Sequence, residues 1–562
     1  MKIFCHSTKI IGRFLFVIIF LSTSHVKSLD KFDKAEQLSN YFSGTLLLSQ
    51  NEYEDSLRFF KKLNGLESSH INFSVKYLYS LVNSGNFKQA FNYSKKLEKQ
   101  KLDNFESNVI IGIYHLKNSN NQLAQKYFLK AKSGNKRFIL NNYISNSLYN
   151  WSRLTNINQV GYDYQKLDAR FENLKKIENA FLNCHFDSSK TNNLFLELVQ
   201  DQKTDFSRYN YFYASYVASK GKINKAKKIV KSALELYPRN LLLNQYKIDL
   251  IKNKNVKIFD CKNKEHVAAE ILYIAANALS SQSMHLQSNF YLNLAKYLNE
   301  DFHSYNILLA ENFYKIDSYQ NAKKIYNNLS KKGEAFHWYS SKQLARIFIQ
   351  QENKNEALKL LKKSYNSLLI KEIYETFDYA EFLKNNEKFE ESIPLYTIIL
   401  NQVEKEHPLY SEAADGRGVS YERIGEWDKA EKDLLDSLEV NPDQAHVINY
   451  LAYSWIEKGI KVKKSLSMLK KANKLRSNDP YITDSLGWAL FKLKRYQEAK
   501  DYLQLAVRLL PSDPIVNDHY GDVLWRNGNE IQARYYWNYV LNLEKTDKKL
   551  KKKIEDKIIK GL

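Results

Sequence analysis

Small and apolar side chains recur along this chain at an interval of 34 residues. Within each copy, apolar positions fall three and four residues apart, which is the spacing of one face of an α-helix. Ala499 and Ala533 occupy the same place in two consecutive copies. Around them stand Leu486, Gly487, Leu503 and Ala506 in the first copy, and Tyr520, Gly521, Gly528, Trp537 and Val540 in the second. The pattern predicts pairs of helices that repeat along the chain.

The same phase extends over most of the sequence. The position that corresponds to Ala499 is alanine or serine in each earlier copy: Ser56, Ala90, Ala124, Ala226, Ser288, Ala322, Ala357, Ser392, Ala430 and Ser465. Small residues are required there because two helices cross closely. A period of 34 with small residues near positions 8 and 20 is typical of tetratricopeptide (TPR) repeats, whose hairpins stack into a superhelix. We therefore expect an all-α fold, a right-handed TPR α-solenoid of about 12–14 repeats.

The phase also predicts how the chain is divided. It slips across the polar stretch 253–265, which is expected to be an irregular linker, and across 402–408, where Pro408 favours a break. Between Ala124 and Ala226 the pattern weakens, so degenerate repeats are expected there. The predicted segments are a signal peptide at 1–28, N-terminal repeats at 29–140, degenerate repeats at 141–206, a repeat with its linker at 207–265, middle repeats at 266–403, well-formed repeats at 404–547 and a charged helix at 548–562.

Signals for helix ends are clearest near the C-terminus. Asp479 and Asp513 each precede a proline, which predicts an N-cap followed by the first residue of a helix. In the final Lys-rich segment, one apolar stripe is formed by Leu550, Ile554 and Ile558. We interpret this segment as a helix that caps the last repeat, in preference to a membrane or nucleic-acid contact.

The N-terminus has the features of a secretory signal. An apolar run at 14–21 is too short to span a bilayer, and Val26 and Ser28 suit cleavage after Ser28. Three basic residues precede the run: Lys2, Lys9 and Arg13. We expect export to the periplasm or cell envelope. The alternative is an inner-membrane anchor formed by an uncleaved signal. After cleavage, Cys184 and Cys261 remain, and nothing local indicates that they meet, so two free cysteines are the favoured expectation.

The charge is distributed unevenly. The whole chain carries a formal net charge of +23, of which residues 29–403 contribute +16 and residues 404–544 contribute −2. A basic surface suits anionic partners such as acidic lipids or glycans. The alternative is a bias in amino-acid usage without functional meaning. Nucleic acid is disfavoured because no known reader motif is present.

The sequence gives little indication of catalysis. It lacks the HExxH, GxSxG and GxxxxGK[ST] motifs and any CxxC pair, and its histidines have no metal-ligand spacing. We therefore predict a protein that is not an enzyme and that needs no cofactor or metal.

The first helix of each repeat is expected to line the concave groove of the superhelix. At position 5 of the last four repeats stand Asp415, Asn449, Asp484 and Asp518. Aromatic residues lie one to two turns further on, among them Trp488 and Trp525. These side chains are predicted to bind an extended peptide. The alternative is that the acids stabilise helix N-termini and the aromatics belong to the core.

Three blocks in the C-terminal repeats resemble exported bacterial TPR proteins: 447–455 (VINYLAYSW), 479–488 (DPYITDSLGW) and 513–526 (DPIVNDHYGDVLWR). The similarity is to alphaproteobacterial envelope TPR proteins and to the TPR lipoprotein adaptors of carboxyl-terminal processing proteases. It implies a non-catalytic, protein-binding scaffold whose partner is an envelope protease or a peptidoglycan hydrolase. This chain lacks the lipid-attachment cysteine of such adaptors, so their membrane anchoring does not carry over.

Overall fold

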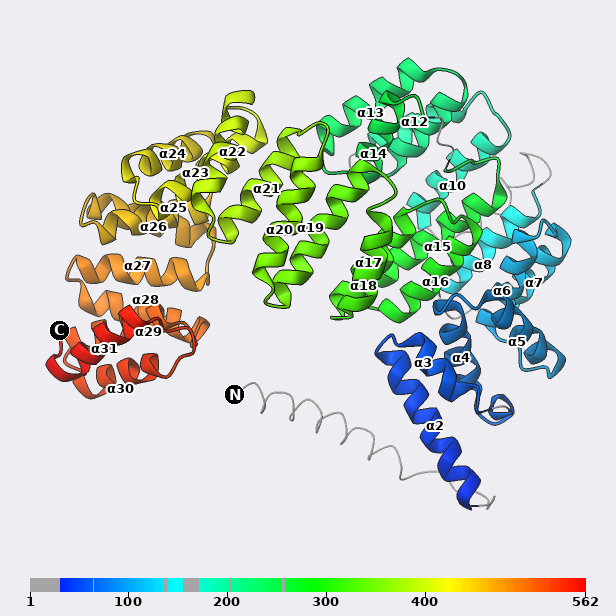
Figure 1. Ribbon diagram of the computed structural model, residues 1–562, viewed down its shortest axis with the longest axis horizontal. Coiled ribbons are helices and arrows are strands. Elements are labelled where there is room, and N and C mark those ends of the chain that lie inside the picture. Colours follow the sequence, from blue (N-terminus) through cyan, green and yellow to red (C-terminus); the bar gives the residue numbers. More distant parts are fainter. Residues whose placement is uncertain (1–30, 64, 135–138, 155–170, 202–204, 255–257) are drawn as a thin grey trace. The chain divides into compact units, whose positions relative to one another are not determined.

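The computed structural model describes residues 31–63, 65–134, 139–154, 171–201, 205–254 and 258–562 (Figure 1). These residues form 29 α-helices and one short 3-10 helix, and they contain no β-strand. The fold is an all-α solenoid of stacked helical hairpins, as the period of 34 residues predicted. The predicted signal peptide lies outside the described residues. The predicted segment boundaries remain predictions.

The chain divides into two compact units, Met1–Gln351 (unit 1) and Glu352–Leu562 (unit 2). In unit 1 the helices follow one another as α2 (Lys31–Ser49), α3 (Tyr53–Phe60), η1 (Leu66–Ser68), α4 (Ile71–Asn83), α5 (Phe87–Lys99), α6 (Phe105–Lys117), α7 (Asn121–Gly134), α8 (Ile139–Ser152), α10 (Glu172–His185), α11 (Thr191–Gln200), α12 (Tyr209–Ser219), α13 (Ile223–Leu236), α14 (Leu241–Ile251), α15 (Lys264–Ser281), α16 (His285–Leu298), α17 (Ser304–Lys315), α18 (Tyr319–Leu329) and α19 (Glu334–Gln350).

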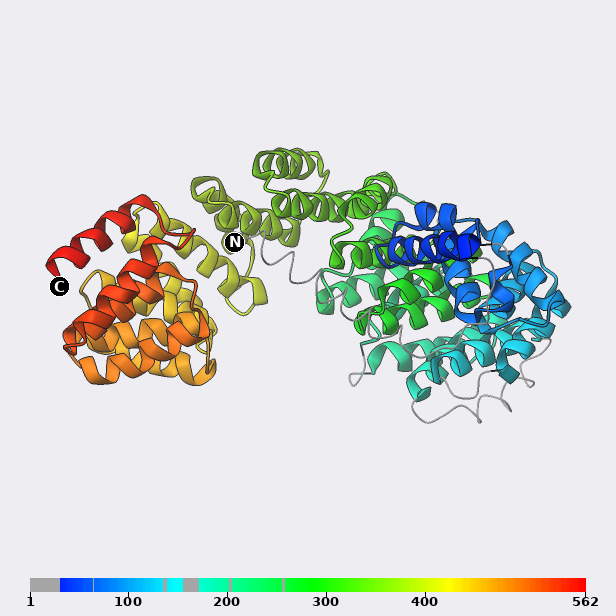
Figure 2. The same ribbon diagram turned by 90° about the horizontal axis from the view of Figure 1, so that it is seen from below.

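Unit 2 is a regular array in which successive hairpins lie side by side, as both views show (Figures 1 and 2). Its helices are α20 (Lys354–Ser367), α21 (Ile373–Asn385), α22 (Phe389–Gln402), α23 (Pro408–Arg423), α24 (Trp427–Val440), α25 (Ala445–Glu457), α26 (Val462–Leu475), α27 (Pro480–Lys492), α28 (Tyr496–Leu509), α29 (Pro514–Arg526), α30 (Glu530–Leu541) and α31 (Lys548–Lys560).

The phased small residues lie where the two helices of a hairpin touch. Every one of them is fully buried, including the structural positions Ala90, Ala124, Ala226, Ala322, Ala357, Ala430, Ala499 and Ala533. On the facing helix the crossing is equally close. A Cβ atom added to Gly487 would lie 2.6 Å from Cγ of Leu503, and one added to Gly521 would lie 2.4 Å from Nε1 of Trp537. Glycine is needed at these two positions because the partner side chain occupies the space of a methyl group.

Serine replaces alanine at some crossings without leaving a hydroxyl unpaired. The Ser56 hydroxyl donates to the carbonyl of Gly44 at 2.8 Å, and the Ser288 hydroxyl donates to the carbonyl of Ala276 at 2.8 Å. A buried hydroxyl that is hydrogen-bonded avoids most of its desolvation penalty. Either serine or alanine can therefore occupy this position of the repeat.

The predicted helix starts are confirmed. Asp479 Oδ1 accepts hydrogen bonds from the backbone N–H groups of Tyr481 and Ile482, at 3.0 and 3.1 Å. Asp513 caps α29 in the same way. Such a cap contributes about 1 kcal/mol of helix stability.

In unit 1, the inner face of the first repeats is covered by a later hairpin of the same chain. Helix α16 packs against α4 and α6, and α15 packs against α8. Asn289 of α16 donates to the Tyr53 hydroxyl at 2.9 Å, and the rings of Tyr79 and Phe290 lie 4.7 Å apart. The groove of these N-terminal repeats is thus occupied by the chain itself.

The phase slip in unit 1 arises from a hairpin that lacks its second helix. Helix α14 ends at Ile251 and α15 begins at Lys264, and the described residues between them form no helix. This segment carries Cys261, which forms a disulfide with Cys184 of α10. The expectation of two free cysteines is therefore wrong. The two are 77 residues apart, and only the return of this segment over α10 brings them together.

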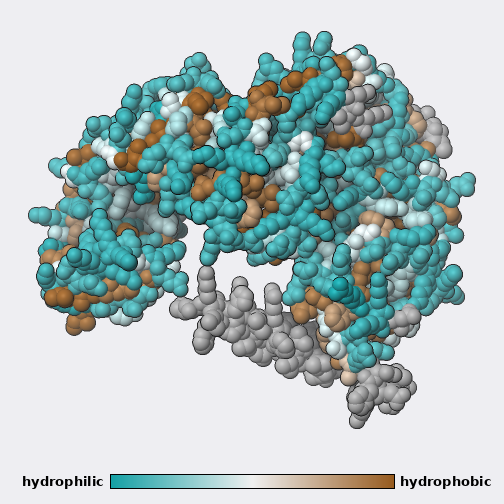
Figure 3. Space-filling view, viewed as in Figure 1, coloured by the Kyte–Doolittle hydropathy of each residue, from teal (hydrophilic) through white to brown (hydrophobic). Residues whose placement is uncertain are grey.

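The surface seen in Figure 3 is mainly hydrophilic, with apolar residues in small patches. Among the described helices, none combines the length and the apolar character that a membrane span requires.

Candidate functional site

The predicted groove residues lie on the first helices of successive repeats in unit 2: Asp415 on α23, Asn449 on α25, Asp484 and Trp488 on α27, and Asp518 and Trp525 on α29. The array therefore aligns the six residues along one row of helices. Their exposure differs, however. Asp484 and Asp518 are only 5% and 2% exposed, whereas Asp415 and Asn449 are half-buried.

Asp484 pairs with a histidine of the next repeat. Nδ1 of His519 lies 2.9 and 3.1 Å from the two carboxylate oxygens of Asp484. The His519 ring stacks on Trp488, with centroids 3.9 Å apart. Burial alone would lower the pKa of His519, but the Asp484 carboxylate outweighs burial and raises this pKa above its usual value. The Trp488 indole in turn donates to Glu457 at 2.7 Å.

Asp518 pairs with the C-terminal helix. Nζ of Lys557, on α31, lies 2.5 Å from Asp518 Oδ1, and 2.6 and 2.8 Å from the two carboxylate oxygens of Asp522. Burial, followed by the neighbouring Asp518 charge, raises the pKa of Asp522 to about 6. The Trp537 indole donates to Asp522 at 3.1 Å. Helix α31 thus supplies the cation for a buried acidic pair on α29.

The same helix covers Trp525. A Cβ atom added to Gly561, just after α31, would lie 2.0 Å from the Trp525 indole. The Arg534 guanidinium also lies over this indole, 4.5 Å from its centroid. Ile554 of α31 is fully buried against the last hairpins, with Leu550 and Ile558 partly buried beside it. Asp484, Asp518, Trp488 and Trp525 therefore carry internal contacts in this state. Asp518 is buried beneath α31, so a partner could reach it only if α31 moved away, whereas Trp525 stays partly exposed.

Asp415 has a different setting, because it lines an open groove in unit 2. The groove has a volume of about 910 Å³ and runs between α21 and the N-terminal ends of α23 and α25. Asp415 contacts Nε2 of the exposed His446 at 3.2 Å, across the groove wall. One repeat on, Oδ1 of Asn449 is buried and has no hydrogen-bond partner among the described residues.

The groove is acidic. Its lining contains two strong bases, Lys384 and Arg476, and five carboxylates, which are Glu381, Glu406, Glu412, Asp415 and Asp443. Glu406 and Glu412 are exposed and form no ion pair among the described residues. Such a lining can hold a cationic, extended segment through salt-sensitive contacts.

Sequence reasoning missed this groove. Residues 372–443 carry 19 acidic and 7 basic residues, within a chain whose net charge is +23. The net charge of residues 404–544 is only −2, because basic residues after 443 balance the acidic residues before it. A window of two repeats would have shown the acidic charge.

Within the part of the chain that the structure describes, no three His, Cys, Asp or Glu residues are grouped as metal ligands. The buried cluster of Asp484, Asp518, Asp522, His519 and Lys557 is internally paired.

Comparison with known proteins identifies the type of repeat in part of the chain. Residues 308–546 match the family described as tetratricopeptide repeat. A TPR repeat-containing protein of Pseudomonas aeruginosa is 29% identical over 144 residues, which cover 25% of this chain and 23% of that protein. The chain thus matches about a quarter of the length of this curated relative. TPR repeats generally bind protein partners, so a protein-binding scaffold is the function class of this part of the chain.

Solved structures of MamA also resemble parts of the chain. MamA of strain AMB-1 is 19% identical with a TM-score of 0.27 and covers 31% of this chain and 99% of MamA. MamA from Desulfovibrio magneticus RS-1, solved from residue 41 to its end, is 15% identical with a TM-score of 0.28, over 32% of this chain and 99% of the solved chain. Scores this low carry no conclusion about function.

Proposed function

We propose that this chain is a non-catalytic scaffold of the bacterial cell envelope, and that unit 2 holds an extended, cationic segment of a partner protein. The observation that carries the proposal is the acidic groove between α21, α23 and α25, which contains Asp415. A concave row of repeat helices is the surface that such solenoids present to partners.

Other inner faces of the helical repeats are already covered by helices of the same chain, which supports this choice of site. In unit 1, α15 and α16 cover α4, α6 and α8. At the end of unit 2, α31 reaches Asp518 and Asp522 on α29. In the groove that contains Asp415, the carboxylates of Glu406 and Glu412 face solvent, so they can pair with lysine or arginine without a change in the fold.

An exported location is part of the proposal. The apolar run at 14–21 and the cleavage signal at Ser28 support it. The disulfide between Cys184 and Cys261 also supports it, because disulfides persist in oxidising compartments such as the periplasm. Immunoblotting of periplasmic and membrane fractions separates cleavage after Ser28 from retention of an uncleaved anchor.

We further propose that the partner is an envelope protease or a peptidoglycan hydrolase, for which the chain acts as an adaptor. The resemblance of the C-terminal repeats to TPR adaptors of carboxyl-terminal processing proteases supports this narrower role. An adaptor forms a stoichiometric complex with the enzyme and raises its turnover. Binding without any change in turnover would leave only the general scaffold.

A second candidate function is a contact with anionic glycan or lipid. The observation that favours it is the net charge of +16 in residues 29–403. Such a contact weakens steeply with salt. Sedimentation with vesicles that contain acidic lipids, at low and high salt, tests it.

Affinity purification from the native envelope tests the groove. We compare the wild type with Glu406→Lys/Glu412→Lys, which reverses two exposed charges of the lining. The control is Glu390→Lys/Asp428→Lys, which makes the same charge change at exposed sites of the same segment outside the groove. The partner should be captured by the wild type and the control and lost from the groove variant. Equal capture by all three proteins would refute the assignment.

A further inference from the structure

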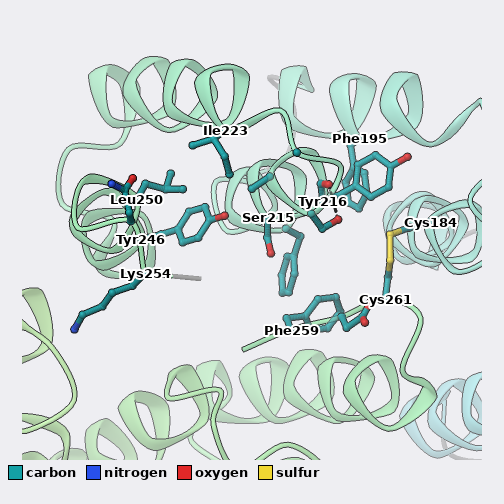
Figure 4. Close-up of a pocket in the computed structure, with 16 residues that line it drawn as sticks. Cys184, Phe195, Ser215, Tyr216, Ile223, Tyr246, Leu250, Lys254, Phe259 and Cys261 are labelled. Atoms are coloured by element: carbon teal, nitrogen blue, oxygen red, sulfur yellow. Dashed lines mark hydrogen bonds between the residues drawn. A yellow bond between two sulfur atoms is a disulfide. The ribbon is translucent and has the colours of Figure 1, made fainter. Parts of the chain in front are cut away.

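A cavity of about 530 Å³ lies inside unit 1, away from the groove of unit 2. It is bounded by α10, α11, α12 and α14, the start of α13, and the described part of the segment that precedes α15. Figure 4 shows the lining residues, which extend from one side of the view to the other. Ile223, Tyr246 and Leu250 gather at one end, and the Cys184–Cys261 disulfide closes the other.

The cavity lining is mixed: aromatic side chains form one part of it, and Ser215, Tyr216 and Asp260 are among its polar residues. Phe195, Phe212 and Phe259 form its walls, and each is at most 5% exposed. The rings of Phe212 and Phe259 lie 4.4 Å apart, edge to face. These aromatic side chains are held in place by neighbouring helices, so the cavity exists before any ligand enters. A preformed, aromatic-lined space of this volume is typical of a small-molecule site.

The entrance is polar and accessible. Ile223 is 39% exposed at the first residue of α13, although it is an apolar side chain that lines the cavity. Ser219 and Lys254, both exposed, also belong to the lining. Lys254 extends away from the ring cluster in Figure 4, which places a cation at the outer end. The opening thus offers an apolar rim next to a positive charge.

The surroundings of the cavity are strongly basic. The described residues of 218–254 and 258–264, which contain the opening, carry 12 basic and 3 acidic side chains. Several of these lysines lie on α13: Lys225, Lys227, Lys228 and Lys231. Charge of one sign around an apolar cleft raises the local concentration of ligands of the opposite sign. The cavity therefore favours a ligand that has an apolar body and an anionic end.

We propose that this cavity binds a single-chain anionic amphiphile, of the long-chain carboxylate class. The chain would lie along Tyr246, Phe212 and Phe259 toward the disulfide. The carboxylate would stay at the opening near Lys254. Lipids with two chains exceed the volume of the cavity. This proposal narrows the second candidate function to one ligand class, and it is independent of the protein-binding groove.

Titration with cis-parinaric acid, whose fluorescence rises in apolar surroundings, tests the proposal on the full chain. We expect saturable binding of one molecule per chain, well below the concentration at which the probe forms micelles. Ile223→Glu adds a carboxylate at the exposed rim and should weaken binding by about tenfold or more, because the probe would bury this charge. Leu236→Glu is the matched control: it lies on the same helix, is 75% exposed and is outside the lining.

The methyl ester of the same probe separates the contribution of the carboxylate charge from that of the hydrocarbon chain. Lys254→Glu should weaken binding of the acid several-fold and leave binding of the ester nearly unchanged, because only the acid has a charge near this side chain. Three results would overturn the proposal: no saturable binding, equal weakening by Ile223→Glu and Leu236→Glu, or an equal effect of Lys254→Glu on acid and ester. None of them would bear on capture of a protein by Glu406 and Glu412 in unit 2.

Discussion

The substitution Lys557→Met tests the internal role of the predicted groove residues. Lys557 is 6% exposed, and its ammonium is within 2.8 Å of oxygens from both Asp518 and Asp522, which are also buried. Methionine keeps much of the side-chain volume and removes the charge. The two buried carboxylates would then keep the Trp537 N–H, the exposed Lys553 at 3.9 Å from Asp518, and the nearby His519.

The expected loss can be estimated from these contacts. Removing one partner of a buried ion pair costs about 3–5 kcal/mol, because the other charge is left uncompensated. Apart from these ion pairs, α31 is held by three apolar side chains, of which only Ile554 is fully buried, by a hydrogen bond from Arg534 Nε to the Ile558 carbonyl at 3.1 Å, and by the contact between Gly561 and Trp525. Full burial of such a side chain contributes about 1.5–3 kcal/mol. The loss is therefore comparable with the energy that holds α31, and we expect the helix to detach.

Hydrogen exchange measured by mass spectrometry reports this detachment directly. At pH 7.5, peptides from 548–560 should lose their protection in Lys557→Met. Protection in α21 and α22 should not change, because neighbouring repeats transmit little beyond their interfaces. The control Lys552→Met removes an exposed charge from the same helix. The triple variant Lys557→Met/Asp518→Asn/Asp522→Asn should recover most of the protection.

The pH dependence gives an independent check. The pKa of Asp522 is already raised to about 6, and loss of Lys557 raises it further. A carboxyl group with a raised pKa in the folded state favours folding when it is protonated. The defect of Lys557→Met should therefore be largest above pH 7 and shrink near pH 5. If Lys557→Met behaves like Lys552→Met, or if the triple variant is no better, the ion cluster does not hold α31.

Three further predictions concern the fold. Gly521→Ala forces a methyl group into the neighbouring indole and should cost about 1–3 kcal/mol in urea unfolding, whereas a neutral outcome would mean that this hairpin relaxes freely. Pairing with Asp484 raises the pKa of His519, so this pair contributes stability below pH 6.5. This stability is lost as the pH rises through the pKa of His519 in the folded state. The melting temperature of the wild type should therefore fall more with rising pH than that of His519→Gln. Cys184→Ser/Cys261→Ser opens a cross-link over 77 residues and should lower the stability of unit 1 by up to about 4 kcal/mol under oxidising conditions, with no difference from the wild type in reductant.

The hairpins could be predicted from the sequence because their requirements are local. Gly487 packs against Leu503 within one repeat, and the same requirement returns 34 residues later at Gly521 and Trp537. The caps at Asp479 and Asp513 depend on only three residues each. Contacts between residues that lie close together in the sequence leave a regular spacing of residue types. The sequence alone is therefore enough to predict them.

The contacts that decide which surfaces are occupied are not local, and the spacing carries no sign of them. Asn289 reaches Tyr53 over 236 residues, and the repeat spacing gives no indication of this contact. The Asp518 carboxylate looked like a ligand contact because position 5 faces the groove. In the structure this carboxylate pairs with Lys557, 39 residues later in the same chain. A groove position therefore indicates that a side chain will meet a partner, and only the tertiary structure shows whether that partner belongs to the same molecule. For this reason the site proposed for a partner in unit 2 is the groove around Asp415.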